Sequence, residues 1–266
     1  MIVINDSGYI DYTNPPITPS KRNFPLIGWK QFIKSATSVN VDGYPIENCL
    51  TENTYQFWRA PSSAPVTVTL TTSPVANGFL GIAAHNLGTH QAKIEVFSGN
   101  TLIGSKSVST NLALMIPLSK NTTGLLTVSI TPTAGLDTTP IQIAVMRVGE
   151  ILEIPCSVGK GEMPSRFQRT TVRSFNRSEK GHYLGSRVKR TALNGNPTFN
   201  VTTFDWYADK LYPFQLYAEI HPFFFAYSPE IRPDDIYYCW STSDFKPKRN
   251  RQFVSWSLPF EAYTNE

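Results

Sequence analysis

From about residue 25 to residue 148 the chain alternates short runs of β-favouring residues with turn residues. In VTVTLT, at 66–71, Val66, Val68 and Leu70 share one face and the threonines share the other, because successive side chains of a strand point to opposite faces. Similar runs recur further along, at 92–99, 126–134 and 141–149. This pattern predicts an antiparallel β-sandwich whose sheets each have one face in solvent.

The chain changes character near residue 150. Residues 159–190 are rich in Ser, Arg and Lys and still alternate, which predicts two paired strands with a turn at 179–181. Two more strand-like runs follow near the end, at 235–242 and 251–260. We therefore expect a mainly β protein of two domains, a sandwich at 1–150 and a small β-rich α+β unit at 151–266.

One short helix is expected in the second domain. Apolar residues there form a loose stripe at helical spacing, namely Leu211, Phe214, Leu216 and Ile220. Thr203 or Asp205 is placed to cap the start of this helix, while Pro213 limits its regularity.

The stretch HPFFFAYSPEIRPDDIYYCW, at 221–240, contains seven Phe, Tyr and Trp side chains. Three consecutive phenylalanines in one strand require cover on both faces. One interpretation is a strand buried on both sides within its own domain, and the other is a strand with one face against another subunit. We expect one face in the domain core, with the surface near Phe224, Tyr227 and Tyr237 partly covered by a neighbouring subunit.

Composition limits the classes of protein to consider. With 41% hydrophobic and 17% charged residues the chain has a globular composition, and no apolar run reaches the ~18 residues of a membrane-spanning helix. The first residues lack the pattern of a signal peptide, so we expect a protein made in the cytoplasm without membrane insertion. A formal net charge of +4 is too mild to indicate a nucleic-acid partner.

The cysteines and histidines do not predict a metal or a disulfide framework. Cys49, Cys156 and Cys239 are odd in number and far apart, which favours buried thiols. The four histidines form no HExxH motif and have no cysteine at zinc-ligand spacing. We expect neither a bound metal nor a cofactor.

The segment NCLTENTYQFWRAPSSAPVTVTLTTSPVANGFLGIAAHNLGT, at 48–89, resembles the galactose-binding-like jelly roll, also called the discoidin or factor 5/8 C type domain. Its opening loop and the buried Trp58 match that family. Thr51 and Glu52 stand where the family has the Asp and Gly of its calcium loop, so the resemblance does not extend to a calcium site. The resemblance implies a jelly-roll sandwich in the first half of the chain.

The second half resembles the C-terminal regions of bacteriophage tail and tail-tip proteins, in its strand pair, short helix and PFFFAYSPEIRPDDIYYCW run. Distal tail proteins combine a barrel-like unit with a galactose-binding-like jelly roll, in the opposite chain order. This resemblance implies a virion structural protein that forms an oligomeric ring with other tail proteins and is located in the phage tail.

Residues at the end of the run FLGIAA are candidates for sugar binding. His85 and Asn86 lie where a strand gives way to a loop, and both side chains can donate and accept hydrogen bonds to sugar hydroxyls. Arg59 would lie at the rim of such a site. The alternative is that the His85 and Asn86 side chains only hold their own loop backbone in place.

No arrangement of residues predicts catalysis. Asp234 and Asp235 are adjacent on a turn after Pro233, where carboxylates point apart, and no GxSxG, P-loop or dinucleotide-binding motif is present. We therefore expect a protein that is not an enzyme.

The main charge asymmetry is a basic cluster that follows residue 160. It consists of Arg166, Arg169, Arg173, Arg177, Lys180, Arg187, Lys189 and Arg190. These side chains suit a nucleic-acid surface, an assembly surface that pairs with acidic neighbours, or a solvated face. Because the aromatic second half also needs partners, we favour assembly, with binding to host surface glycans as the alternative function of the protein.

Overall fold

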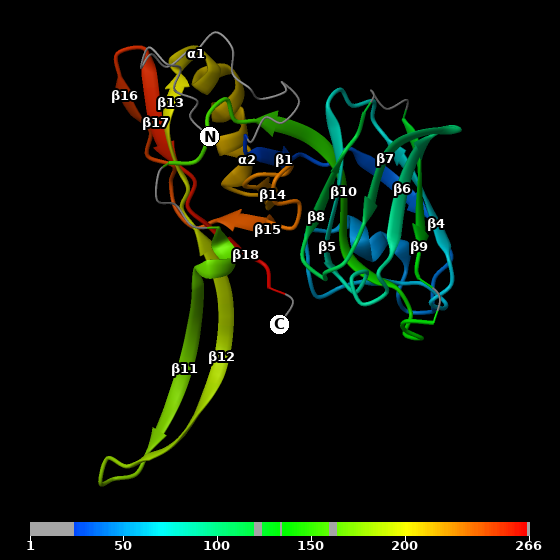
Figure 1. Cartoon of the computed structure of the whole chain (residues 1–266), viewed down its shortest axis with the longest axis horizontal. Helices are drawn as coiled ribbons and strands as arrows, with labels where there is room; N and C mark the ends of the chain where they lie inside the picture. The colour runs from blue at the N-terminus through cyan, green and yellow to red at the C-terminus, as the bar shows by residue number, and fades with distance from the viewer. Residues whose placement is uncertain (1–23, 120–123, 134, 160–163, 265–266) are drawn as a thin grey trace, which may run out of the picture.

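The computed structural model describes residues 24–119, 124–133, 135–159 and 164–264, apart from the side chain of Arg190. Strands and one short helical segment form two bodies that lie side by side, and a two-stranded ribbon leads away from them (Figure 1). The predicted fold class, mainly β with one short helix, is confirmed. No helix among these residues is long and apolar enough to cross a lipid bilayer.

The first body is the predicted jelly-roll sandwich. One of its sheets has the strand order β2 (Ile33–Thr37), β4 (Val66–Thr72), β9 (Leu125–Thr131), β6 (Lys93–Ser98) and β7 (Thr101–Ser107). The facing sheet contains β3 (Trp58–Arg59), β10 (Gln142–Glu153), β5 (Gly78–His85) and β8 (Leu114–Pro117). A 3-10 turn, η1 (Ile46–Leu50), closes one side of the core. In β4 the residues Val66, Val68 and Leu70 are buried, as their alternation with threonine predicts.

Strand β10 belongs to both bodies. Its first part pairs with β5, from Ile143 opposite His85, and its last part pairs with β1 (Leu26–Trp29), with Leu26 opposite Glu153. Strand β1 then pairs with β14 (Phe223–Ala226) of the second body. A single sheet therefore runs through the molecule in the order β11-β12-β18-β15-β14-β1-β10-β5-β8. The predicted domain boundary at residue 150 falls inside β10, and the division of the chain into two domains stays a prediction.

The second body packs a helical segment and a small sheet against the far end of the shared sheet. The remaining strands are β11 (Arg169–Arg177), β12 (Tyr183–Gly195), β13 (Thr198–Thr203), β15 (Ile236–Ser241), β16 (Lys248–Asn250), β17 (Phe253–Ser257) and β18 (Phe260–Ala262). Strands β13, β17 and β16 form a separate three-stranded sheet. The core between these layers is rich in aromatic rings, including a stacked pair, Phe199 and Trp256, with ring centroids 4.3 Å apart.

The helical segment consists of α1 (Phe204–Trp206), a π-helical turn η3 (Tyr207–Leu211) and α2 (Tyr212–Ala218). The hydroxyl of Thr203 accepts a hydrogen bond from the Trp206 amide at 3.3 Å, so the predicted cap is confirmed. Leu211 and Phe214 are buried, but Leu216 and Ile220 are exposed, so only half of the predicted stripe faces the core. The π-helical turn ends just before Pro213, which cannot donate a helical hydrogen bond.

The three consecutive phenylalanines are covered on both faces by the chain itself. Phe223 and Phe225 point into the aromatic core of the second body, and all three side chains have 0% exposure. Phe224 points the other way, against Phe79 and Tyr238 between the two bodies, with its ring centroid 5.7 Å from that of Phe79. The strand is therefore buried on both sides within the chain, but its own domain covers only one of its faces and the sandwich covers the other.

The aromatic surface that we expected at a subunit interface lies inside the molecule. Phe224, Tyr227 and Tyr237 are all at most 5% exposed. Tyr227 and Tyr237 are buried in the aromatic core of the second body, and Phe224 is covered by the sandwich. These three residues therefore do not form an assembly surface.

The ring of Phe79 packs directly against the backbone of three glycines, which have no side chain to occupy that space. A Cβ atom at Gly28 would lie 2.6 Å from the Phe79 ring, and one at Gly81 or Gly149 would lie 2.7 Å from it. These glycines lie in β1, β5 and β10, the neighbouring strands where the two bodies meet. Any larger residue there would displace the ring.

All three cysteines are free thiols, and Cys49 and Cys239 are buried. Burial raises the pKa of the Cys49 thiol to about 12, so it stays protonated at neutral pH.

Replacing Phe224 by alanine is expected to lower the free energy of unfolding by about 3–5 kcal/mol, because it empties a fully buried ring site. The matched control is Tyr212→Ala, which removes a ring that is 49% exposed and lies outside the hairpin, and which should change stability by no more than about 0.5 kcal/mol. Urea denaturation measures both. Equal losses in the two variants would contradict the assignment of Phe224 to the core between the bodies.

Candidate functional site

His85, a predicted sugar ligand, is 3% exposed, and its ring bonds to the backbone of its own loop and of the connection between β7 and β8. Its Nε2 donates to the Leu112 carbonyl at 2.8 Å, and its Nδ1 accepts from the Leu87 amide at 3.2 Å. Burial, with a smaller contribution from the positive charge of Lys106, lowers the pKa of His85 to about 4. His85 is therefore neutral at pH 7, and both of its ring nitrogens are bonded to backbone groups.

The side chain of Asn86 also forms its hydrogen bonds with backbone groups. Its amide group donates to the Pro140 carbonyl at 2.9 Å and accepts from the Gln142 amide at 2.8 Å. These two bonds fasten the loop after β5 to the start of β10. The alternative of loop backbone support, rather than sugar binding, fits both His85 and Asn86.

Arg59 is partly exposed, and its guanidinium group packs over a pair of stacked rings. It lies 4.2 Å from the ring centroid of Tyr44 and 5.3 Å from that of Phe57. Trp58 is fully buried in the sandwich core, as the resemblance implied. Arg59 does not itself line the hollow that contains His85 and Asn86, but it lies beside it, since it packs against Phe57 and pairs with Gln142, which both line that hollow.

Arg147 is a buried cation that joins the two bodies. It is 1% exposed, and its guanidinium group donates to the Pro222 carbonyl at 2.7 Å and to Glu52 Oε1 at 2.8 Å. His221 also contacts Glu52 Oε1, at 2.9 Å. Sequence reasoning missed this network, although an arginine inside the apolar run IQIAVMRVG was a signal of a paired buried charge.

Glu52 has a different role from the residue that it replaces in the resembled calcium loop. Its carboxylate faces Arg147, and a guanidinium group competes directly with a metal cation for those oxygens. Among the described residues, no three His, Cys, Asp or Glu side chains gather where they could hold a metal ion.

Two hollows flank the exposed ring of Tyr55. One has a volume of about 330 Å³ and is lined by residues of both bodies, including Glu52, His221 and Trp240. The other has a volume of about 310 Å³ and contains His85 and Asn86 with the amide side chains of Asn111 and Gln142. Tyr55 is 72% exposed and lines both hollows.

Strands β11 and β12 form a long hairpin that leads away from both bodies (Figure 1). Arg169 pairs with Leu193 and Arg177 with Tyr183, and the turn closes with the Gly181 amide donating to the Ser178 carbonyl. The strand pair predicted for this segment, with its turn at 179–181, is confirmed. Strand β12 pairs with β18 only from Leu193 onward, so within the described structure both edges of the outer ribbon lack a strand partner.

The outer hairpin exposes apolar and basic side chains together. The large exposed apolar residues are Val172, Phe175, Tyr183, Leu184 and Val188. The exposed basic residues are Arg173, Arg177, Lys180, Arg187 and Lys189. Arg169 is also exposed, near the base of the hairpin, and the Arg190 side chain lies outside the described residues.

Arg166, in the 3-10 turn η2 (Ser165–Phe167), anchors the base of the hairpin. Its Nε lies 3.2 Å from the carboxylate of Asp235, which is fully buried, and its amide donates to the Tyr237 hydroxyl at 3.1 Å. Arg166 is itself partly exposed, but unlike the basic residues further out it holds the base of the hairpin to the second body.

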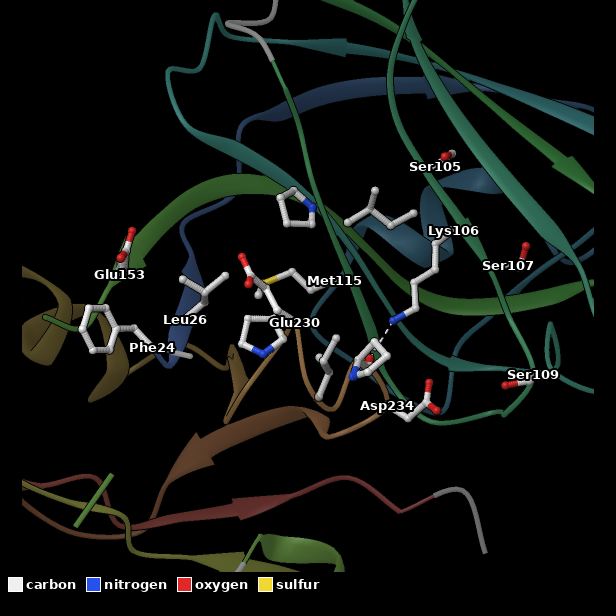
Figure 2. A pocket seen from close by; sticks show the side chains of 15 residues that line it. Phe24, Leu26, Ser105, Lys106, Ser107, Ser109, Met115, Glu153, Glu230 and Asp234 are labelled. Atoms are coloured by element: carbon white, nitrogen blue, oxygen red, sulfur yellow. Dashed lines mark hydrogen bonds between the residues drawn. The ribbon is translucent and has the colours of Figure 1, made fainter. Parts of the chain in front are cut away.

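A groove of about 830 Å³ lies between the two bodies, between β7 and β8 on one side and the β14–β15 loop on the other. Its floor is apolar and includes Leu26, Met115 and Ile236. The Nζ of Lys106 reaches across to donate to the Pro233 carbonyl at 2.7 Å (Figure 2). Burial lowers the pKa of Lys106.

No family model matches this chain, and no curated protein matches it. Among solved structures it is similar to a pectin-binding carbohydrate-binding module, at 15% identity over 48% of this chain and 94% of the other, with a TM-score of 0.35. A CBM32 module of AlyQ in complex with 4,5-unsaturated mannuronic acid is similar at 17% identity over 48% and 100%, with a TM-score of 0.36. XRCC1, in a reduced form bound to the DNA polymerase β catalytic domain, is similar at 14% identity over 47% and 98%, with a TM-score of 0.35. At these scores the likenesses carry no argument about what this chain binds.

His85 is expected to make stability depend on pH. Because its folded pKa is about 4 and its ordinary value is 6.5, its contribution is complete above about pH 6.5 and is lost as the pH falls toward 4. The loss amounts to roughly 3 kcal/mol, since each unit of pKa difference corresponds to about 1.4 kcal/mol. The free energy of unfolding, measured between pH 4.5 and pH 7.5, should fall more steeply in the wild type than in a His85→Gln variant. Parallel curves would show that His85 is not held neutral.

Proposed function

We propose that this chain is a non-enzymatic structural protein that assembles into an oligomer, and that the outer part of the β11–β12 hairpin holds neighbouring subunits together. The observation that carries this proposal is the exposed apolar surface of the hairpin, which no other described part of the chain covers. A two-stranded hairpin is marginally stable in water by itself. Exposed apolar side chains beside free strand edges are typical of surfaces that a partner covers.

The basic residues of the hairpin fit the same role. They are interspersed with the apolar side chains on both strands, which suits a partner surface with acidic groups around an apolar centre. The positive charges also oppose pairing between the free strand edges of two hairpins, because like charges repel each other.

The finer proposal is that the oligomer belongs to the tail or tail tip of a bacteriophage virion. It is supported by the resemblance of the aromatic segment at 221–240 to tail proteins and by the pairing of a jelly roll with a second β-rich unit. In this proposal the partners are further copies of this chain and other tail proteins, and the location is the virion.

A second candidate function is binding of a surface glycan beside Tyr55. An exposed aromatic ring between two hollows that contain carboxylate, imidazole and amide groups can stack on a sugar ring while those groups bond its hydroxyls. This site replaces His85 and Asn86 as the proposed sugar ligands, since the hydrogen-bonding groups of those residues are used in the loop.

Shortening the hairpin is expected to convert an oligomer into a folded monomer. The variant joins Val172 to Arg190, a register pair, through Asn-Gly, a pair of residues that favours a tight two-residue turn. Sedimentation velocity of the wild type should show an oligomer, and the variant should sediment as a monomer that still melts in a cooperative transition. A wild-type chain that stays monomeric at every concentration, alone and with virion extracts, would contradict the proposed assembly.

Glycan binding, if it is the function, should depend on Tyr55. Tyr55→Ala is expected to weaken binding to a glycan array by about tenfold or more through loss of stacking. The matched control is Tyr212→Ala, which removes another exposed tyrosine outside both hollows. Equal binding by both variants, or no binding by the wild type, would exclude this second candidate.

A further inference from the structure

We propose that the groove between the two bodies receives the outer hairpin of a second copy of this chain. This inference rests on the proposed assembly and names the surface that the hairpin contacts. The groove combines an apolar floor with three carboxylates, Glu153, Glu230 and Asp234, against one ammonium group, that of Lys106. The hairpin presents the complementary set, exposed aromatic and aliphatic side chains surrounded by basic ones.

The groove is large and already shaped. Its volume of about 830 Å³ exceeds those of the two hollows near Tyr55, and it lies between strands β7 and β8 of the sandwich and the β14–β15 loop of the second body. The hydrogen bond of Lys106 to the Pro233 carbonyl fixes the β14–β15 loop relative to β7. Figure 2 shows the Asp234 carboxylate on this loop and Met115 and Leu26 on the floor. A pocket with an apolar floor and charges at its edge is the form that a projecting aromatic anchor fits.

The occupant must come from another molecule. The hairpin leaves the second body beside β18 and leads away from β7 and β8, so its turn does not approach the groove of its own chain (Figure 1). One surface of each copy would therefore meet a different surface of the next copy. Such a contact gives a two-fold dimer where both hairpins of a pair reach the partner's groove at once, and a closed ring or an open filament where only one does.

Charge reversal on either surface is expected to break this contact. The groove variant carries Glu230→Lys and Asp234→Lys, and the hairpin variant carries Arg173→Glu and Arg177→Glu. Each should raise the subunit dissociation constant by about 100-fold or more, because like charges then face each other across the interface. A second groove variant, Ser107→Arg, adds bulk and positive charge at an exposed position and should also prevent assembly.

Mixing the two charge variants provides the sharpest test. In the mixture the unchanged hairpin of the groove variant fits the unchanged groove of the hairpin variant, and the glutamates of the changed hairpin face the lysines of the changed groove. Each variant alone should therefore stay monomeric, whereas the mixture, and a chain with all four changes, should recover an oligomer of the wild-type size. The surface control is Asp42→Lys with Lys248→Glu, at exposed positions outside the groove and the hairpin, which should assemble as the wild type does.

The outcomes separate this inference from the proposed function. If the shortened hairpin abolishes assembly while both groove variants assemble normally, the hairpin contacts another surface and the groove inference is wrong. If the wild type never assembles, the proposed assembly function is wrong, and the groove inference that rests on it is wrong as well. A benzophenone amino acid at position 107 should crosslink to residues 173–189 of a second copy, and a crosslink to the chain's own residues 1–23 would overturn the inference. Melting curves confirm that each variant is folded.

Discussion

The packing of one ring on bare backbone determines how the two bodies sit together. Phe79 occupies the space that Gly28, Gly81 and Gly149 leave empty, and Phe224 from the second body packs against it. Because close-packed interiors leave little room for adjustment, this contact fixes the angle at which the shared sheet enters the second body. The large groove and the hollow beside Trp240 both lie between the bodies, so their shapes depend on that angle.

Arg147 supports the same arrangement by a different means. A buried guanidinium group without partners would cost several kcal/mol. The arrangement of the two bodies in which Arg147 donates to Glu52 and to the Pro222 carbonyl is therefore strongly preferred over arrangements that lack these bonds. Glu52 comes from the loop after η1, and Pro222 precedes β14. The network contributes specificity of orientation, while the apolar contacts around Phe224 contribute most of the stability.

The sequence was informative wherever local pattern decides the outcome. The alternation in β4, the Thr203 cap and the turn at 179–181 all follow from side-chain periodicity or from short-range hydrogen bonds, and each was predicted. The packing of Phe224 against the sandwich was not predicted from the sequence, because it depends on strands that are far apart in the chain. The same limitation applies to His85: its residue type suited a ligand, and only the contact with Leu112 showed that it supports its loop. The hairpin's basic residues were recognised, but pattern alone could not separate Arg166, at the base, from the exposed residues beyond it.

The position of β1 has a consequence for how the chain folds during its synthesis. This strand lies between β10 and β14, so its two neighbours are made long after it leaves the ribosome. The sandwich strands from β2 to β9 can pair among themselves earlier, since their partners are closer in sequence. Contacts of such high sequence separation form slowly and leave unpaired edges exposed in the meantime. Completion of the shared sheet is therefore a late folding event that requires the β14 segment, and a ribosome-bound chain that ends before residue 223 should still lack its final tertiary structure.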